Sequence, residues 1–279
     1  MRKAIMRTAA SGALAATMMV ALLGLGLRNR GRQGVALAGA PAVCSGASLQ
    51  GTYAAISSGF ALTGSGGTPL ATPTPFAAVG LLTFDGVGGG TAALTENAGG
   101  RLVPINGTII YSVNAECTGS LTLQIGKTRT RTWSLVVEGA GQTVRVATDN
   151  IQFAIGLSAE LLPAGGCSDA SLQGAYGGLA SGFLLNGPDG TPLPSPQPFV
   201  EALVWTLDGA GNATLDTQGP DGATATYSVN ADCTGAWIET SSSGVTTGSA
   251  FVVLGGGTTI LMEGADPGKV VSFSADLLP

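Results

Sequence analysis

The chain has 279 residues, with a hydrophobic share of 44% and a charged share of 10%, so it is long enough for two domains that each bury a core. Six of its 12 basic residues lie in the first 40 positions. The rest of the chain has the other six and all 17 acidic residues, so its net charge is 6 − 17 = −11. This charge argues against nucleic acid and anionic membranes as partners. The chain has no His, the commonest metal ligand and general base, and we expect neither a metal nor a cofactor.

The first 40 residues are typical of a targeting segment. Three basic residues precede an uncharged apolar stretch from Ala9 to Leu27, and small residues around Ala38 offer cleavage sites. The stretch is also close to the length of a single membrane span, and three arginines follow it. We expect residues 1–40 to be a cleaved signal peptide, with a retained N-terminal anchor helix as the alternative. The protein is then exported, extracellular or periplasmic, and touches a membrane only through this segment.

Four sequence blocks occur twice, in the same order, after this segment. For example, CSGASLQGTY returns as CSDASLQGAY, and YSVNAECTG returns as YSVNADCTG. The offset between copies is 123 residues up to an Asp-Gly turn and 116 residues from the YSVN block onward, so one indel near residues 97–104 relates the copies. The repeat predicts two modules, residues 44–163 and 167–279.

Each module contains about eight strand-like runs separated by Gly-rich turns of the kind found in hairpins. Eight antiparallel strands in a meander can close into an up-and-down barrel, which leaves no exposed edge. We therefore predict an all-β protein of two tandem antiparallel modules, each an eight-stranded up-and-down barrel, with a two-sheet sandwich as the alternative. In the second module the predicted strands are Leu172–Leu185, Phe199–Leu207, Asn212–Thr217, Ala223–Val229, Gly235–Thr240, Thr247–Leu254, Thr258–Glu263 and Lys269–Leu278.

Each module also carries two cysteines, which in an exported protein favour the disulfides Cys44–Cys117 and Cys167–Cys233. In a meander, the start of strand one and the end of strand four lie at the same end of the barrel, where these cysteines stand. The Pro-rich segments TPLATPTP and TPLPSPQP, predicted as long loops, lie at the opposite end. We call this opposite end the mouth, because a ligand would enter there.

The succession of SLxGxY, FDGxG and YSVNxDCTG, in both modules, resembles a group of uncharacterised exported bacterial proteins. The resemblance implies small calycin-like barrels, of the general kind seen in allene oxide cyclase. It covers essentially residues 44–279, and its motifs are structural. It brings no catalytic residue to this chain.

One candidate site consists of Lys127, Arg129 and Arg131, which alternate with threonines and so share one face of a strand. They begin the sixth strand of the first module, at its mouth, and the second module has Ser, Val and Thr there. These cations are interpreted either as an anion-binding mouth that grips a carboxylate or phosphate, or as a solvated face. A contact with the acidic second module is a further alternative, since the two modules are expected to pack together.

The other candidate site consists of Glu201 and Glu239, which replace Ala78 and Leu123 of the first module. Glu201 follows the Pro-rich segment at the mouth, and Glu239 shares a strand face with Trp237. Two inward carboxylates could bind a ligand, or act as an acid/base pair on a glycoside. The alternative is that both point to solvent or pair with a neighbour.

The leading hypothesis is an exported, non-enzymatic tandem β-barrel that binds a small ligand or a surface component. A structural or adhesive envelope protein with filled barrels is the alternative, and an enzyme acting in a barrel mouth comes third. An open cavity lined by polar residues would favour binding, whereas interiors filled by Leu, Val and Phe would favour the structural hypothesis.

Overall fold

The computed structural model describes residues 43–64, 67–148, 152–187, 189–216, 223–264, 266 and 268–279. The predicted signal or anchor segment, residues 1–40, lies outside these ranges. Within them, no helix has the length and apolar character needed to cross a bilayer.

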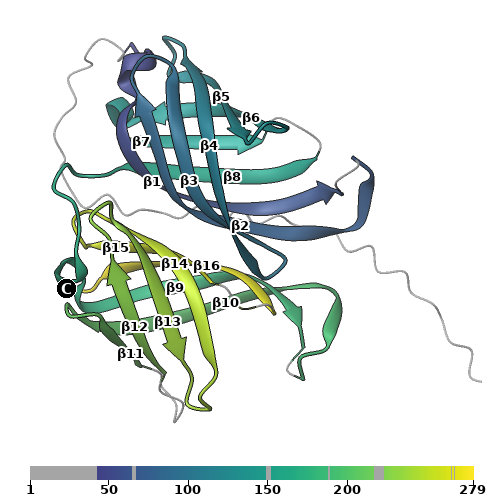
Figure 1. Cartoon of the computed structure of the whole chain (residues 1–279), viewed down its shortest axis with the longest axis vertical. Coiled ribbons are helices and arrows are strands. Elements are labelled where there is room, and N and C mark those ends of the chain that lie inside the picture. The colour runs from purple at the N-terminus through teal and green to yellow at the C-terminus, as the bar shows by residue number, and fades with distance from the viewer. Residues whose placement is uncertain are drawn as a thin grey trace, which may run out of the picture. The chain divides into compact units, whose positions relative to one another are not determined.

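The described chain forms two closed barrels of eight antiparallel strands each (Figure 1). In each barrel, neighbouring strands in sequence pair with each other, and the first strand also pairs with the last, so the sheet closes on itself. The predicted all-β fold with two up-and-down barrels is confirmed, and the sandwich is not formed. The strands of barrel one are β1 (Gln50–Thr63), β2 (Pro69–Asp85), β3 (Gly89–Ala98), β4 (Arg101–Val113), β5 (Thr118–Ile125), β6 (Arg129–Glu138), β7 (Thr143–Thr148) and β8 (Phe153–Leu161).

Barrel two repeats this strand order. A short 3-10 turn precedes each barrel, η1 (Gly46–Ser48) in the first and η3 (Asp169–Ser171) in the second. A third 3-10 turn, η2 (Gly139–Gly141), lies between β6 and β7. Its strands are β9 (Gln173–Asn186), β10 (Pro192–Asp208), β11 (Asn212–Asp216), β12 (Thr224–Val229), β13 (Thr234–Thr240), β14 (Thr246–Leu254), β15 (Thr259–Gly264) and β16 (Lys269–Leu277). Apart from the start of β10, the predicted strands of this module agree with the observed ones to within one residue at each end.

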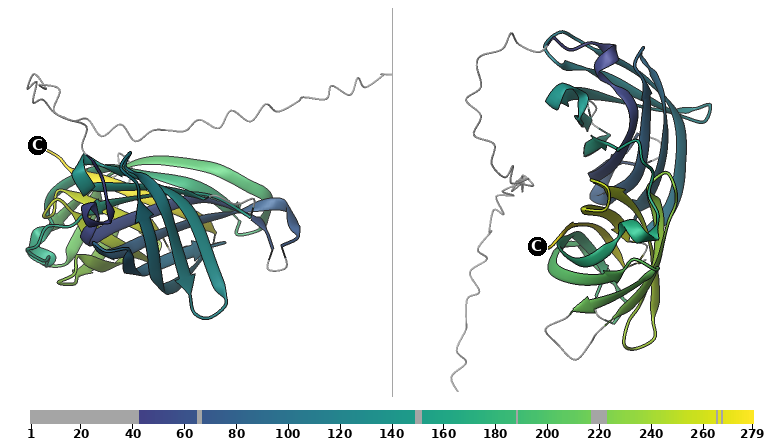
Figure 2. Two further views of the ribbon diagram at one scale, coloured as in Figure 1. Left: turned by 90° about the horizontal axis from the view of Figure 1, so that it is seen from above. Right: turned by 90° about the vertical axis from the view of Figure 1, so that its left-hand side faces the viewer.

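The prediction that the two Pro-rich segments are loops is wrong, because both belong to strands. β2 begins at Pro69 and β10 at Pro192, and each pairs with the preceding strand across a register shift. β2 pairs with β3 only from Phe76 onward, so residues 69–75 have no strand on their other side. Proline is tolerated there because its missing N–H would have no ladder partner. Each hairpin therefore continues beyond its barrel as a two-stranded arm (Figure 2).

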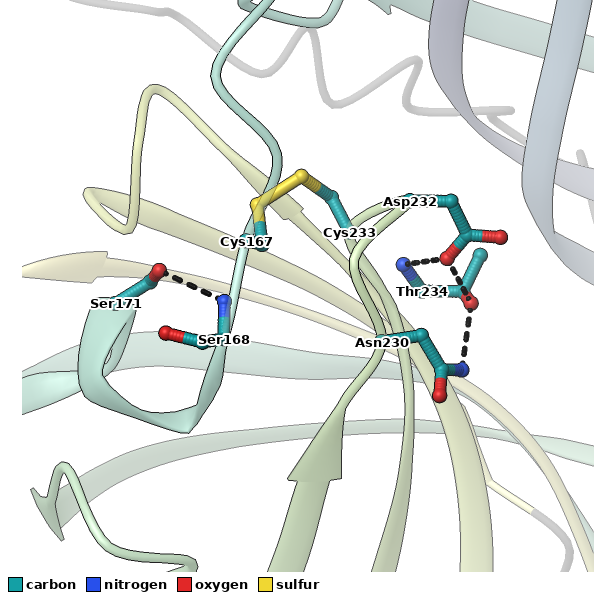
Figure 3. The surroundings of a disulfide bond; sticks show 7 residues. All are labelled: Cys167, Ser168, Ser171, Asn230, Asp232, Cys233 and Thr234. Carbon is teal, nitrogen blue, oxygen red and sulfur yellow. Dashed lines mark hydrogen bonds between the residues drawn. A yellow bond between two sulfur atoms is a disulfide. The ribbon is translucent and has the colours of Figure 1, made fainter.

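Disulfides close the end of each barrel opposite the arm. Cys44 is joined to Cys117 and Cys167 to Cys233, as predicted. Cys117 and Cys233 both have a positive φ, of 61° and 68°, at the sharp turn that follows the fourth strand. In barrel two, Thr234 supports this turn by donating from its backbone N–H and its hydroxyl to Asp232 (Figure 3). Two disulfides and no free cysteine suggest an oxidising compartment.

Buried tyrosines fill this closed end. Their hydroxyls donate to backbone carbonyls: Tyr53 to Gly141, Tyr176 to Gly257, Tyr111 to Leu49 and Tyr227 to Leu172. Gly257 has a φ of +108°, and a Cβ on it would lie 1.8 Å from the carbonyl oxygen of Ser171, so only glycine fits. These contacts seal one end of each barrel in the same way.

Candidate ligand-binding cavity

Barrel two contains a cavity of about 370 Å³. Its walls come from β9 to β11 and from β13 to β16, so it lies in the half of the barrel nearest the mouth. Alternate residues along each strand face inward, which places Phe199, Glu201, Leu203 and Trp205 of β10 on one wall. Both glutamates proposed from the sequence line this cavity, with Glu239 on β13.

Two tryptophans form the floor of the cavity. Trp205 and Trp237 are 4% and 2% exposed, and their rings meet edge to face with centroids 4.9 Å apart. The ring of Tyr227 stacks beneath Trp237, with centroids 6.0 Å apart and planes 16° from parallel. This packing fixes the indoles, so the floor is a rigid aromatic surface.

Charged side chains surround the part of the cavity nearest the mouth. The Lys269 Nζ lies 3.4 Å from Asp266 Oδ2 and 5.8 Å from the centroid of the Phe199 ring. Glu201 is exposed and Glu239 is half-buried, and neither forms an ion pair or side-chain hydrogen bond in the described part of the chain. The cavity thus carries three carboxylates and one ammonium.

The environment of Glu239 disfavours its charged form. Burial raises the pKa of its carboxyl above the ordinary value of 4.5, the ammonium of Lys269 opposes this rise, and the nearby carboxylate of Glu201 adds to it. A half-buried carboxylate without a partner is costly, and a bound positive charge would lower that cost.

Glu239→Gln should therefore change how stability depends on pH. The folded protein holds the Glu239 proton more tightly than the unfolded chain, so this group's stabilising contribution is full below the ordinary pKa of 4.5 and is lost as pH rises through the higher folded pKa. We expect the variant to gain stability relative to the wild type as pH rises above 4.5, measured by urea unfolding. A stability difference that is constant or falls with pH would contradict this explanation. Comparing the two proteins cancels the contribution of Glu263, a fully buried carboxyl with a raised pKa that faces away from the cavity.

The corresponding space in barrel one is filled. Ser249 of β14 pairs with Trp237, and its counterpart in barrel one is Trp133, which pairs with Leu121. Trp133 is 7% exposed, within a continuous core of aliphatic and aromatic side chains. The cavity of barrel two therefore exists where a serine has replaced an indole.

The mouth of barrel one is closed by an ion pair. Arg131 points inward from β6, and its Nη2 lies 3.1 Å from Glu96 Oε2, with both side chains largely buried. The Arg131 guanidinium also lies 5.4 Å from the centroid of the Phe76 ring and 5.2 Å from that of Phe153. Two aromatic rings and a carboxylate thus surround this cation.

The hairpin that carries Glu96 is shorter in barrel two. β3 and β4 have 10 and 13 residues, whereas β11 and β12 have 5 and 6 within the ranges that the structure describes, which leave out residues 217–222 between them. The disulfide-closed loops span 73 and 66 residues, so the second is seven residues shorter, and the predicted indel falls in this hairpin. The longer wall of barrel one brings Glu96 to Arg131.

The other two predicted cations are placed apart from this ion pair. Lys127 lies in the turn before β6 and not in the strand, which begins at Arg129, and both side chains are exposed. Arg131 is already neutralised by Glu96. The three residues therefore do not form one cluster of free cations.

Several cavity residues were not identified from the sequence, among them Lys269 and Asp266. Lys269 replaces Phe153 of the first module, and Ser249 replaces Trp133, so the aligned copies contained a usable signal. Changes from large to small inward residues mark the cavity as clearly as the two added glutamates do. In the ranges that the structure describes, no group of three or more His, Cys, Asp or Glu side chains could hold a metal ion.

No protein-family model matches the chain, and no curated protein matches it. Among solved structures, it is similar to a protein of unknown function from the DUF3598 family of Nostoc punctiforme PCC 73102. The two chains are 16% identical, the match covers 83% of this chain and 97% of that one, and the TM-score is 0.23.

Proposed function

We propose that the protein is an exported, non-enzymatic binding protein whose second barrel holds a small ligand. The main support for this proposal is the cavity of about 370 Å³ in barrel two. Ligand sites typically measure about 300–1,000 Å³ and combine apolar and aromatic walls with a few polar groups. The cavity of barrel two combines a tryptophan floor with charged side chains near the mouth, which is such a mixture of aromatic and polar groups. Export is supported by the two disulfides and by the character of residues 1–40.

Barrel one favours a different role within the same molecule. Its interior is filled by buried side chains, and Arg131 with Glu96 occupies its mouth. We propose that it acts as a structural module, which is the alternative function considered for the whole chain. An enzyme acting in the mouth of barrel two is a third possibility, and turnover of glycosides by the purified protein would support it over simple binding.

Ser249→Trp tests the binding proposal by filling the cavity as Trp133 fills barrel one. A thermal-shift screen of small molecules on the full chain should find ligands that raise the melting temperature, because a ligand stabilises the state that it binds. The variant should lose at least about 1.4 kcal/mol of binding free energy, a tenfold change, as measured by calorimetry. Ser228→Trp places the same side chain on the exposed face of β12 and should bind normally. Unchanged binding by folded Ser249→Trp would contradict the proposal.

A further inference from the structure

We infer that the ligand of barrel two is a small organic cation with an apolar body, bound with its charge near Glu201 and Glu239 and its body against Trp205 and Trp237. This inference rests on the proposed binding function and adds the chemical class of the ligand.

The charges around the cavity favour a cation. Lys269 and Asp266 lie 3.4 Å apart and largely neutralise each other. Glu201 and Glu239 remain, and the charged form of Glu239 is disfavoured chiefly by burial, with the attraction of Lys269 larger than the repulsion of Glu201. One ammonium and three carboxylates give the cavity wall a net charge of 1 − 3 = −2, so a ligand with one positive charge is attracted and an anion is repelled.

The aromatic floor favours the same class of ligand. A cation within about 6 Å of a tryptophan face is attracted by the ring's quadrupole, and the attraction is stronger where water is excluded. Trp205 and Trp237 are both nearly fully buried and line the cavity, while Phe199 already lies beside the Lys269 ammonium. The apolar surface of the indoles suits an apolar body attached to the charge.

Barrel one provides an internal example of this recognition. There, the guanidinium of Arg131 lies beside the Glu96 carboxylate and the rings of Phe76 and Phe153. Arg131 pairs with Leu123 across β5 and β6, and the equivalent pair in barrel two is Thr247 with Glu239. At this position barrel two therefore has a threonine opposite a carboxylate, and its own cation, Lys269, comes from β16 and lies beside Phe199, the equivalent of Phe76. Because Lys269 is paired with Asp266, an organic cation from solution would occupy the space that the Arg131 guanidinium fills in barrel one.

A matched ligand series tests the inference on the full chain. The probes are 2-phenylethylamine, its neutral analogue 2-phenylethanol and its anionic analogue 3-phenylpropanoate, with affinities measured by isothermal titration calorimetry at neutral pH. We expect the amine to bind at least about tenfold more tightly than the alcohol, which corresponds to one charge-assisted contact, and the carboxylate to bind most weakly.

Two variants locate the charge preference. Glu239→Gln and Glu201→Gln should each weaken amine binding about fivefold to tenfold while changing the alcohol's affinity less than about twofold. Asp276→Asn removes one negative charge from the exposed face of β16 and should leave all three affinities unchanged. Circular dichroism and the alcohol's affinity show that each variant is folded.

The outcomes separate this inference from the proposed function. If the alcohol or the carboxylate binds as tightly as the amine, or the Glu variants keep the amine's affinity, the cation inference is overturned and the binding function stands. If none of the three probes binds and the thermal-shift screen also finds no ligand, both are overturned.

Discussion

Replacing Cys167 and Cys233 together by serine should lower the free energy of unfolding of barrel two by about 4 kcal/mol. The disulfide closes a loop of 66 residues, and in the chain-entropy model a loop of that length restricts the unfolded chain by about this amount. A single domain is usually stable by about 5–15 kcal/mol, so the variant would be close to unfolding.

Urea unfolding followed by tryptophan fluorescence measures this effect for barrel two alone. In a Trp133→Phe background the remaining tryptophans, Trp205 and Trp237, both belong to that barrel. The matched control is Cys44→Ser with Cys117→Ser, which removes the disulfide of barrel one and should leave this barrel-two transition almost unchanged. A loss below about 1 kcal/mol for the barrel-two pair would show that its stability does not depend on this disulfide.

Trp237→Ala should cost barrel two about 3–5 kcal/mol and also remove the floor of the cavity. The indole is 2% exposed and packs against Trp205 and Tyr227, so its removal leaves a void that neighbouring rings can fill only in part. Ile238→Ala is a matched control on the same strand, because Ile238 faces outward and is 53% exposed. It should change stability by less than about 0.5 kcal/mol. Equal effects of the two substitutions in urea unfolding would contradict the placement of Trp237 inside the barrel.

The repeat made most of the fold predictable. Alternating residues and Gly-rich turns gave the strands, and the position of the cysteines in a meander gave the disulfides. The arms were missed because Pro69 and Pro192 suggested loops, and local propensity does not show that one edge of a strand is free.

The candidate site was predictable in part. Strand parity put Glu239 on the same face as Trp237, and the Pro-rich segment put Glu201 at the mouth; pointing to solvent was the alternative for both, and both line the cavity. Parity also put Arg131 on one strand face with Lys127 and Arg129, but parity within one strand cannot show whether that face is buried or which residue of another strand lies opposite. Its partner Glu96 comes from β3, and the two meet only because that hairpin is long enough. The volume of the cavity likewise depends on many side chains at once, and no single motif encodes it.

The central claim is that barrel two, and not barrel one, holds a small molecule. Nuclear magnetic resonance of the labelled full chain with 2-phenylethylamine tests it most directly, through intermolecular nuclear Overhauser effects to the indole protons. We expect contacts from the ligand to Trp205 and Trp237, with none to Trp133. Contacts to Trp133, or only to residues on the outer faces of the barrels, would contradict it.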